Sequence, residues 1–127
     1  LIEELCAKLR NLSELYTAAD VFVMPNRTLA SGDAEGFGLV FLEAGLSGVP
    51  GVGGRSGGVP EAIIDGQTGL LGDGRNYHDV AQAVIRLLLD KKLRRQMGRT
   101  GYEYAKSQSW DAKAAKLAEL IDACAEL

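Results

Sequence analysis

Residues 35–61 read EGFGLVFLEAGLSGVPGVGGRSGGVPE, and this stretch decides the expected fold. It holds two glycine-rich loops, and each loop leads into a short apolar run typical of a helix or a strand. Glycines allow a backbone to come close to a ligand and to adopt positive φ angles. A helix that begins directly after such a loop presents free N–H groups and a positive dipole end to an anion. The stretch therefore predicts a phosphate-binding loop.

Glu43 is the charged residue within an apolar run from Leu39 to Leu46. A helix that is apolar on every side is a buried helix, and a charge inside it is costly unless it is paired or liganded. Because Leu39 and Glu43 are four residues apart, the carboxylate is expected over the same face as the first free amides. A ligand whose phosphate meets those amides could offer hydroxyl groups to Glu43. The alternative is that Glu43 reaches water at a helix edge or pairs with a core arginine.

The spacing of Glu35 and Glu43 around the sequence GFGL resembles the signature of retaining glycosyltransferases of family 4, which have the GT-B fold. Five flanking blocks agree with this family and extend the resemblance over nearly the whole chain: AADVFVMP (18–25), GVP (48–50), SGGVPE (56–61), DGQTGLL (65–71) and SWD (109–111). The loop of residues 25–35 is most similar to that of mannosyltransferases that use GDP-mannose, including those that mannosylate phosphatidylinositol mannosides. The resemblance implies the carboxyl-terminal, donor-binding domain of such an enzyme.

The resemblance also implies roles for individual residues. Glu43 would accept hydrogen bonds from both ribose hydroxyls of the nucleotide sugar, because a carboxylate has two acceptor oxygens. Glu35 would contact the transferred hexose beside the reacting carbon and is the catalytic candidate. Backbone amides would bind sugar hydroxyls and stabilise the leaving diphosphate; they belong to Gly36, Phe37, Gly38 and Leu39. This arrangement requires no metal and no cofactor besides the donor substrate, for which GDP-mannose is the expected example.

The expected fold is α/β, with a Rossmann-like parallel sheet and flanking helices in a single domain over residues 1–127. This domain is expected to be a partial nucleotide-sugar-binding domain, because residues 9–12 leave no room for a strand that the family has there. Residues 77–127 are expected to be its carboxyl-terminal helices. Strands are expected at 21–24, 49–53 and 70–71, although glycines at 51 and 53 weaken the second strand. Apolar spacing predicts two buried helix stripes: Val80, Val84, Leu87 and Leu88 on one helix, and Ala114, Leu117, Leu120, Ile121 and Cys124 on another. Phe37, Phe41 and Trp110 are expected to pack in the core, with stacking on a sugar as the alternative.

Composition favours an ordinary globular protein, with 46% hydrophobic and 24% charged residues and a net charge of −3. A basic cluster at 91–95 has few aromatic neighbours, which argues against nucleic-acid binding. It either contacts anionic lipid head groups or is a solvated helix face. Cys6 and Cys124 lie far apart without metal-ligand spacing, which favours a reducing compartment. We therefore expect a cytoplasmic chain whose parent enzyme is peripheral at the inner membrane face.

Two further expectations concern activity and partners. The family grips the diphosphate with an arginine and a lysine from the first part of this domain, and it binds the acceptor on an amino-terminal domain. Neither feature is found in these residues, since Arg27 and Arg55 are the nearby candidates for the diphosphate grip and neither matches the family's positions. The chain alone is therefore expected not to transfer sugar. The expected partners are the nucleotide-sugar donor, the amino-terminal domain, and a sugar or glycolipid acceptor.

Two alternatives remain open at the level of sequence. One is a module that binds a nucleotide diphosphate without catalysis. The other is a serine hydrolase, because residues 54–58 match the Gly-x-Ser-x-Gly elbow around Ser56, and Asp65 and His78 follow in the order of a triad. The elbow requires a helix that begins at the serine, whereas glycines and Pro60 delay the next helix.

Overall fold

The computed structural model describes residues 12–33 and 36–125, and in this part of the chain it forms a three-stranded parallel sheet. The strands are β1 (Phe22–Met24), β2 (Gly51–Gly54) and β3 (Gly69–Gly72), in the order β1-β2-β3. Val23 pairs with Val52, and Val52 pairs with Leu70. The predicted α/β class with a parallel sheet is therefore confirmed.

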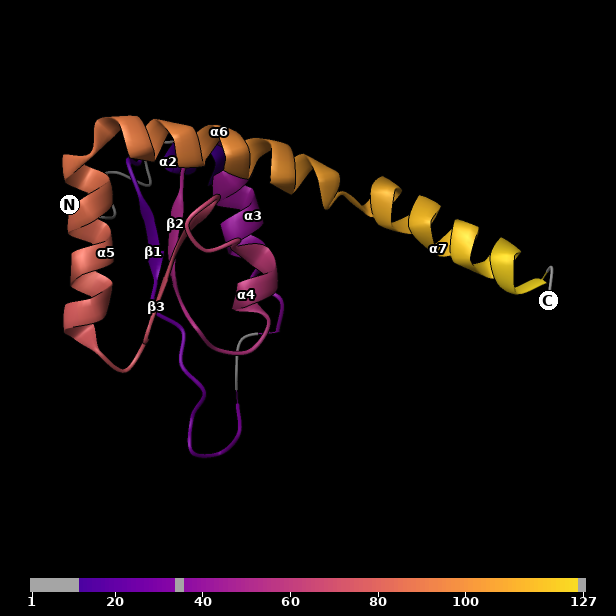
Figure 1. Ribbon diagram of the computed structural model, residues 1–127, viewed down its shortest axis with the longest axis horizontal. Helices are drawn as coiled ribbons and strands as arrows, with labels where there is room; N and C mark the ends of the chain where they lie inside the picture. Colours follow the sequence, from indigo (N-terminus) through magenta and orange to yellow (C-terminus); the bar gives the residue numbers. More distant parts are fainter. Residues whose placement is uncertain (1–11, 34–35, 126–127) are drawn as a thin grey trace.

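Helices cover both faces of this sheet (Figure 1). Helices α3 and α4 lie on one face and α5 lies on the other (Figure 1). Helix α6 crosses one end of the sheet, and the long loop after β1 projects from the opposite end (Figure 1). The helices are α2 (Leu12–Thr17), α3 (Leu39–Leu46), α4 (Val59–Ala62), α5 (Tyr77–Leu89), α6 (Lys91–Ser107) and α7 (Trp110–Ala125).

Two glycines of β2 make room for the core on the α3 side. A Cβ atom at Gly51 would lie 2.8 Å from the Phe41 ring, and one at Gly53 would lie 2.8 Å from Val59. The space that a β-branched residue normally fills in such a strand is therefore filled from the helices. Phe41 and Val59 are buried there together with Ile63. This packing explains why glycines that weaken a strand in isolation are tolerated in this one.

The core on the α5 side joins Val52 and Leu70 of the sheet to Leu87 of α5 and Met97 of α6. Full burial of side chains of this size stabilises the fold by about 1.5 to 3 kcal/mol each. The prediction that Leu88 belongs to the buried stripe is wrong, because its side chain is 48% exposed. It lies near the end of α5, where the chain turns into α6.

Helices α3 and α6 approach closely because glycines face each other where they meet. A Cβ atom at Gly45 would lie 3.1 Å from the backbone oxygen of Gly101, and one at Gly98 would lie 2.1 Å from the oxygen of Gly48. Gly98 lowers the helix propensity of α6 but allows this contact. The contact fixes α3, which carries the predicted site, against the rest of the domain.

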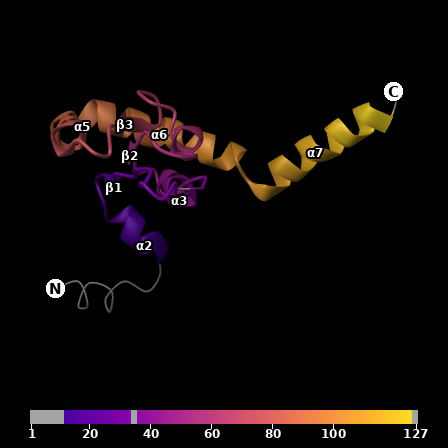
Figure 2. The same ribbon diagram turned by 90° about the horizontal axis from the view of Figure 1, so that it is seen from below.

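Helix α7 extends away from the sheet (Figure 2). The Ser109 side chain accepts a hydrogen bond from the Ala112 amide at 3.2 Å, as a helix cap does. The predicted burial along this helix is wrong. The residues concerned are all exposed: Trp110, Ala114, Leu117, Leu120, Ile121 and Cys124.

Candidate functional site

The loops that follow the three strands meet at one edge of the sheet. A Cβ atom at Gly54 would lie 1.8 Å from the backbone oxygen of Asn26, and a Cβ atom at Gly74 would lie 2.1 Å from the same oxygen. These backbones are therefore in direct contact, and only glycine fits at the two positions. Ligands of open α/β sheets bind at this carboxyl edge of the strands. The edge contains a cavity of about 220 Å³.

The predicted phosphate-binding loop joins the same edge. A Cβ atom at Gly58, in the loop after β2, would lie 1.9 Å from the Gly36 oxygen, so the two glycine-rich loops pack backbone against backbone. Gly38 precedes α3 with φ 78° and ψ 45°, in the left-handed region, and no side chain caps the helix. The amides of the first turn of α3 are thus not occupied by a capping side chain, as an anion site requires. Phe37 is half-buried and Leu39 is exposed.

Glu43 lies on an open face of α3, so the expectation of a fully buried helix is wrong. Phe41 and Ala44 face the core, but Leu39 is 58% exposed, Leu46 is 50% exposed and Glu43 is also exposed. The sequence shows that every side of the helix is apolar, but within the described residues only part of its circumference is covered. Because Glu43 is exposed, burial gives no support for a ligand there. The assignment of Glu43 to the ribose hydroxyls depends on the family resemblance.

Tyr16 is the described partner of this carboxylate. Its hydroxyl donates a hydrogen bond to Glu43 Oε2 at 2.9 Å. Both residues line a cavity of about 280 Å³ between α2 and α3, together with Leu12, Leu46 and Ser47. The hydrogen bond orients the carboxylate through Oε2, and Oε1 is the second acceptor that a further donor can use.

The alkaline stability of the protein should depend on Tyr16. Burial, then the hydrogen bond to Glu43 and the charge of Glu43, raise the pKa of Tyr16 from 10.0 to about 12. Between these values the unfolded chain loses the tyrosine proton while the folded chain keeps it, so the free energy of unfolding falls as the pH rises. The loss attributable to Tyr16 should be about 2 to 3 kcal/mol between pH 10 and 12. Urea denaturation of the wild type and of Tyr16→Phe across this range measures it.

In this experiment, the stability of Tyr16→Phe should decline less steeply with pH than that of the wild type. Tyr77→Phe is the matched control, because its ring is 75% exposed and packs only against that of His78 among the ring contacts described. Parallel curves for the wild type and Tyr16→Phe would contradict the assignment.

Comparison with known proteins identifies the family of this chain. Residues 7–104 match the model of the glycosyl transferases group 1. The chain belongs to this family. It is 48% identical over 108 residues to the GDP-mannose-dependent alpha-(1-6)-phosphatidylinositol monomannoside mannosyltransferase of Mycobacterium tuberculosis, a match that covers 84% of this chain and 28% of that protein.

Another relative is the D-inositol 3-phosphate glycosyltransferase of Corynebacterium glutamicum, which is 42% identical over 111 residues, covering 87% of this chain and 25% of the relative. Among solved structures, sucrose-phosphate synthase from Thermosynechococcus elongatus superposes with a TM-score of 0.72 at 30% identity. That match covers 89% of this chain and 27% of the synthase. The chain thus spans between a quarter and a third of the length of these proteins. The predicted resemblance to GT-B glycosyltransferases is confirmed.

The predicted site residues of this group 1 domain are only partly described. Gly36, Phe37, Gly38 and Leu39 form the loop and the start of α3, and Glu43 follows one helical turn later. Glu35, the catalytic candidate, lies outside the described residues. The catalytic role therefore remains a prediction from the family pattern.

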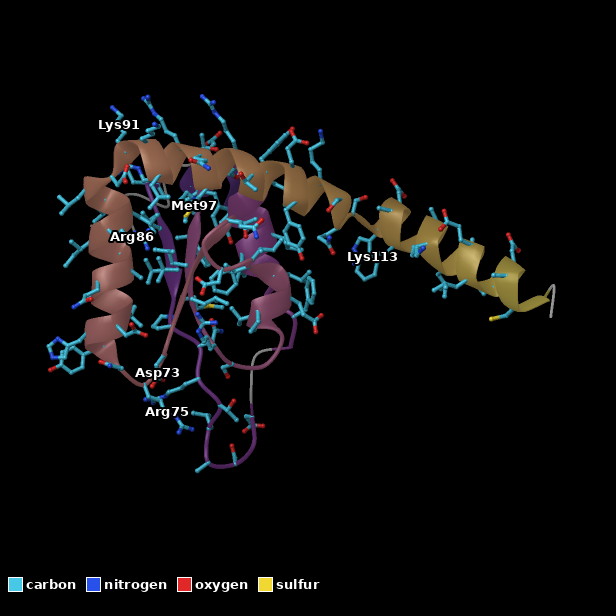
Figure 3. The ribbon with its side chains drawn as sticks, viewed as in Figure 1. Asp73, Arg75, Arg86, Lys91, Met97 and Lys113 are labelled. Atoms are coloured by element: carbon cyan, nitrogen blue, oxygen red, sulfur yellow. The ribbon has the colours of Figure 1, made fainter. Side chains whose placement is uncertain are left out.

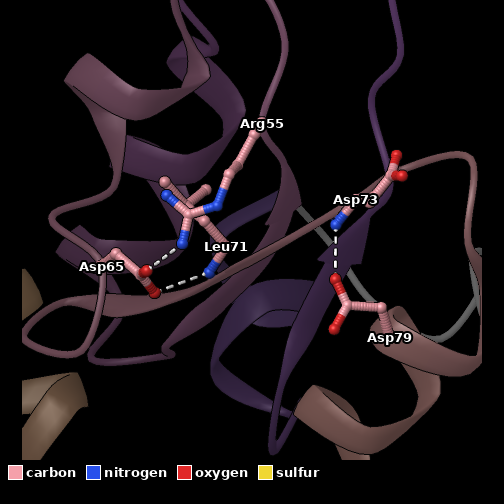
Figure 4. A network of polar contacts seen from close by, with 5 residues as sticks. All are labelled: Arg55, Asp65, Leu71, Asp73 and Asp79. Carbon is pink, nitrogen blue, oxygen red and sulfur yellow. Dashed lines mark hydrogen bonds and ion pairs between the residues drawn. The ribbon is translucent and has the colours of Figure 1, made fainter.

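Within the described residues, the three side chains of the hydrolase alternative contact other residues and not one another. Ser56 is 7% exposed, and its hydroxyl is 2.8 Å from that of Thr28. Asp65 pairs with Arg55 and accepts a hydrogen bond from the Leu71 amide (Figure 4). The His78 ring packs on Tyr77, and α4 begins at Val59 rather than at the serine. In the part of the chain that the structure describes, no contact joins these three side chains into a triad.

Sequence reasoning named Arg27 and Arg55 as nearby candidates, but it did not group them with Arg75 at the carboxyl edge. Arg27, Arg55 and Arg75 all line the 220 Å³ cavity. The sequence contains a signal for them, because one arginine stands within three residues after the end of each strand. Among the described residues, no group of three or more His, Cys, Asp or Glu side chains is placed to hold a metal ion.

Proposed function

We propose that this chain forms the donor-binding part of a retaining glycosyltransferase of family 4, which moves a hexose from a nucleotide diphosphate sugar to an acceptor. GDP-mannose is the proposed donor, because the mycobacterial relative is named for its dependence on this molecule. One observation supports the proposal most. Gly38 precedes α3 in a left-handed conformation, and Gly36 packs against Gly58 of the loop after β2. Glu43 lies one turn further along the same helix and is exposed.

The chemistry follows from this order along α3. The first-turn amides and the positive end of the helix dipole would hold the diphosphate and stabilise its charge as it leaves. Glu43 would accept hydrogen bonds from the two ribose hydroxyls, with Tyr16 holding one of its oxygens in place. Glu35 would contact the hexose beside the reacting carbon. Backbone amides of Gly36, Phe37, Gly38 and Leu39 would complete the contacts to sugar and phosphate.

The acceptor and the rest of the enzyme are part of the same proposal. Both relatives described above act on inositol-containing compounds according to their names, and one of these is a phosphatidylinositol glycolipid. A glycolipid acceptor bound on an amino-terminal domain would place the whole enzyme at a membrane surface. No helix among the described residues is long and apolar enough to cross a membrane. The proposed contact between the enzyme and the membrane is peripheral. The exposed Lys91, Lys92 and Arg95 of α6 form one surface for anionic head groups.

Titration calorimetry of the 127-residue chain with GDP, UDP and ADP tests the donor assignment. We expect a nucleoside diphosphate to bind, with GDP binding more tightly than UDP or ADP because the proposed donor carries guanine. The same chain incubated with GDP-mannose should give no glycosylated product, since the proposal places the acceptor on another domain. Absence of binding by all three diphosphates at millimolar concentration would count against the site. Tighter binding of UDP or ADP than of GDP would indicate a UDP-sugar or an ADP-sugar as the donor instead of GDP-mannose.

Binding without turnover is also what a non-catalytic module would show. The isolated chain cannot separate these two functions, but a protein that includes the amino-terminal domain can. Transfer of mannose by that longer protein, with loss of transfer in Glu35→Gln, would support the enzyme. Nucleotide binding without transfer by the longer protein would support the module.

A further inference from the structure

Three arginines emerge side by side from the contact between the strand loops. Arg27 follows Asn26, Arg55 follows Gly54 and Arg75 follows Gly74. Asn26, Gly54 and Gly74 are the residues whose backbones meet at the carboxyl edge, with hypothetical Cβ distances of 1.8 and 2.1 Å to the Asn26 oxygen. Each arginine is thus attached to a rigid junction directly next to the other two. Their convergence is a property of the fold.

The loops around the junction are held by hydrogen bonds to neighbouring elements. Arg75 Nη2 donates to the backbone oxygen of Thr28 at 3.1 Å, which ties the loop after β3 to the loop after β1. Asp79 of α5 accepts a hydrogen bond from the Asp73 amide at 2.6 Å (Figure 4). The cavity is therefore bounded by fixed backbone, and Figure 3 shows Asp73 and Arg75 at the end of the molecule opposite Lys91 of α6.

The charges in this cavity are unbalanced. Arg55 forms an ion pair with Asp65 and is neutralised by it. Within the described residues, no carboxylate lies at ion-pair distance from the guanidinium groups of Arg27 or Arg75. Asp73 is the acidic residue in the lining, and its Oδ1 accepts a hydrogen bond from the Arg75 backbone amide at 2.9 Å. In the described part of the chain, two guanidinium groups in one small cavity therefore have no carboxylate at ion-pair distance.

We propose that this cavity is a phosphoryl-binding subsite, in which Arg27 and Arg75 hold the anion. The planar guanidinium group presents paired N–H donors that match phosphate geometry. The hydroxyl groups of Thr28 and Ser56 are hydrogen-bonded to each other at 2.8 Å in the same lining, and the one that accepts in this pair supplies a further donor. This subsite rests on the proposed function, and it shares no lining residue with the cavity at Glu43. It is therefore an additional contact to substrate.

Two substrates could supply the phosphoryl group. One is the diphosphate of the donor, and the other is the phosphate of an inositol phosphate acceptor, the compound class in the name of the corynebacterial relative. The probes that distinguish them are GDP and D-inositol 3-phosphate, each with its phosphate-free counterpart, guanosine or inositol. Inorganic pyrophosphate reports on the subsite without either substrate.

The experiment follows backbone amide shifts of the ¹⁵N-labelled 127-residue chain during titration with each probe. We expect pyrophosphate to shift the amides of Arg27, Ser56 and Arg75, and we expect the Arg27→Gln/Arg75→Gln variant to bind it at least tenfold more weakly. The control is Lys113→Gln, which removes an exposed cation of α7 far from Arg75 (Figure 3) and should change affinity less than twofold. Circular dichroism melting checks that each variant is folded.

The outcomes separate this inference from the proposed function. A loss of GDP binding in the double variant assigns the subsite to the donor, and a loss restricted to D-inositol 3-phosphate assigns it to the acceptor. If the wild type and the double variant bind every phosphate probe equally, the subsite is refuted while the donor site on α3 stands. If the wild type binds pyrophosphate but not GDP, the subsite stands and the donor proposal fails. If no phosphate probe binds the wild type, the subsite is refuted.

Discussion

Replacement of Glu43 by glutamine should weaken GDP binding by about tenfold to a hundredfold. Hydrogen bonds to a charged group contribute about 1.5 to 3 kcal/mol each, and each 1.4 kcal/mol corresponds to a factor of ten in affinity. Glutamine keeps the size of the side chain but removes the charge and one of the two acceptor oxygens. Because Glu43 is exposed, the protein should fold normally and the change should appear in binding alone. Titration calorimetry of both proteins with GDP measures it.

Two further variants sharpen this result. Glu103→Gln removes the same charge from an exposed position on α6, so it should leave GDP affinity unchanged. Tyr16→Phe keeps the carboxylate but removes the hydrogen bond that orients it, and it should cause a smaller, severalfold loss. Equal affinity of Glu43→Gln and the wild type would remove the ribose contact from the proposed function. The α3 amides would then be the main remaining donor contact on that helix.

The sequence predicted the elements well where local signals agree. The apolar run from Leu39 to Leu46 became α3 with these bounds. The helices expected from residue 77 onward begin at Tyr77, directly after Asn76, whose side chain accepts hydrogen bonds from two amides. Capping and strand-ending glycines act over a few residues, so a single sequence reveals them. The glycines at positions 51 and 53 conflicted with the prediction of a strand there, because glycine has a low strand propensity. In the structure, the ring of Phe41, ten residues earlier in the chain, fills the space beside Gly51. Strand propensity alone does not reveal such a contact.

The errors have a common physical cause. Apolar spacing shows which face of a helix is hydrophobic, but it does not show whether another element covers that face. Glu43 and Leu46 were expected inside a buried helix, and Ile121 was expected in a buried stripe, yet all three are exposed in the described structure. The arginine cluster was missed for the opposite reason. Arg27 and Arg75 are 48 positions apart, and only the pairing of parallel strands brings them to one cavity.

Replacement of Gly54 by alanine should destabilise the protein by about 3 kcal/mol or more, because the added Cβ atom would lie 1.8 Å from the Asn26 oxygen. A backbone cannot yield to such a contact as a flexible side chain can, and overpacking costs in this range are among the larger effects of single substitutions. Urea denaturation followed by circular dichroism measures the free energy of unfolding.

Gly101→Ala is the matched control for this substitution. A Cβ atom there meets its nearest neighbour at 3.4 Å, an ordinary contact, and alanine is favoured over glycine within a helix by about 1 kcal/mol. The two changes are chemically identical, yet they should alter stability in opposite directions. If Gly54→Ala were as stable as the wild type, the three loop backbones would not be in contact. The arginines would then lack the rigid junction that brings them together, so this stability measurement also tests the geometric basis of the phosphoryl subsite.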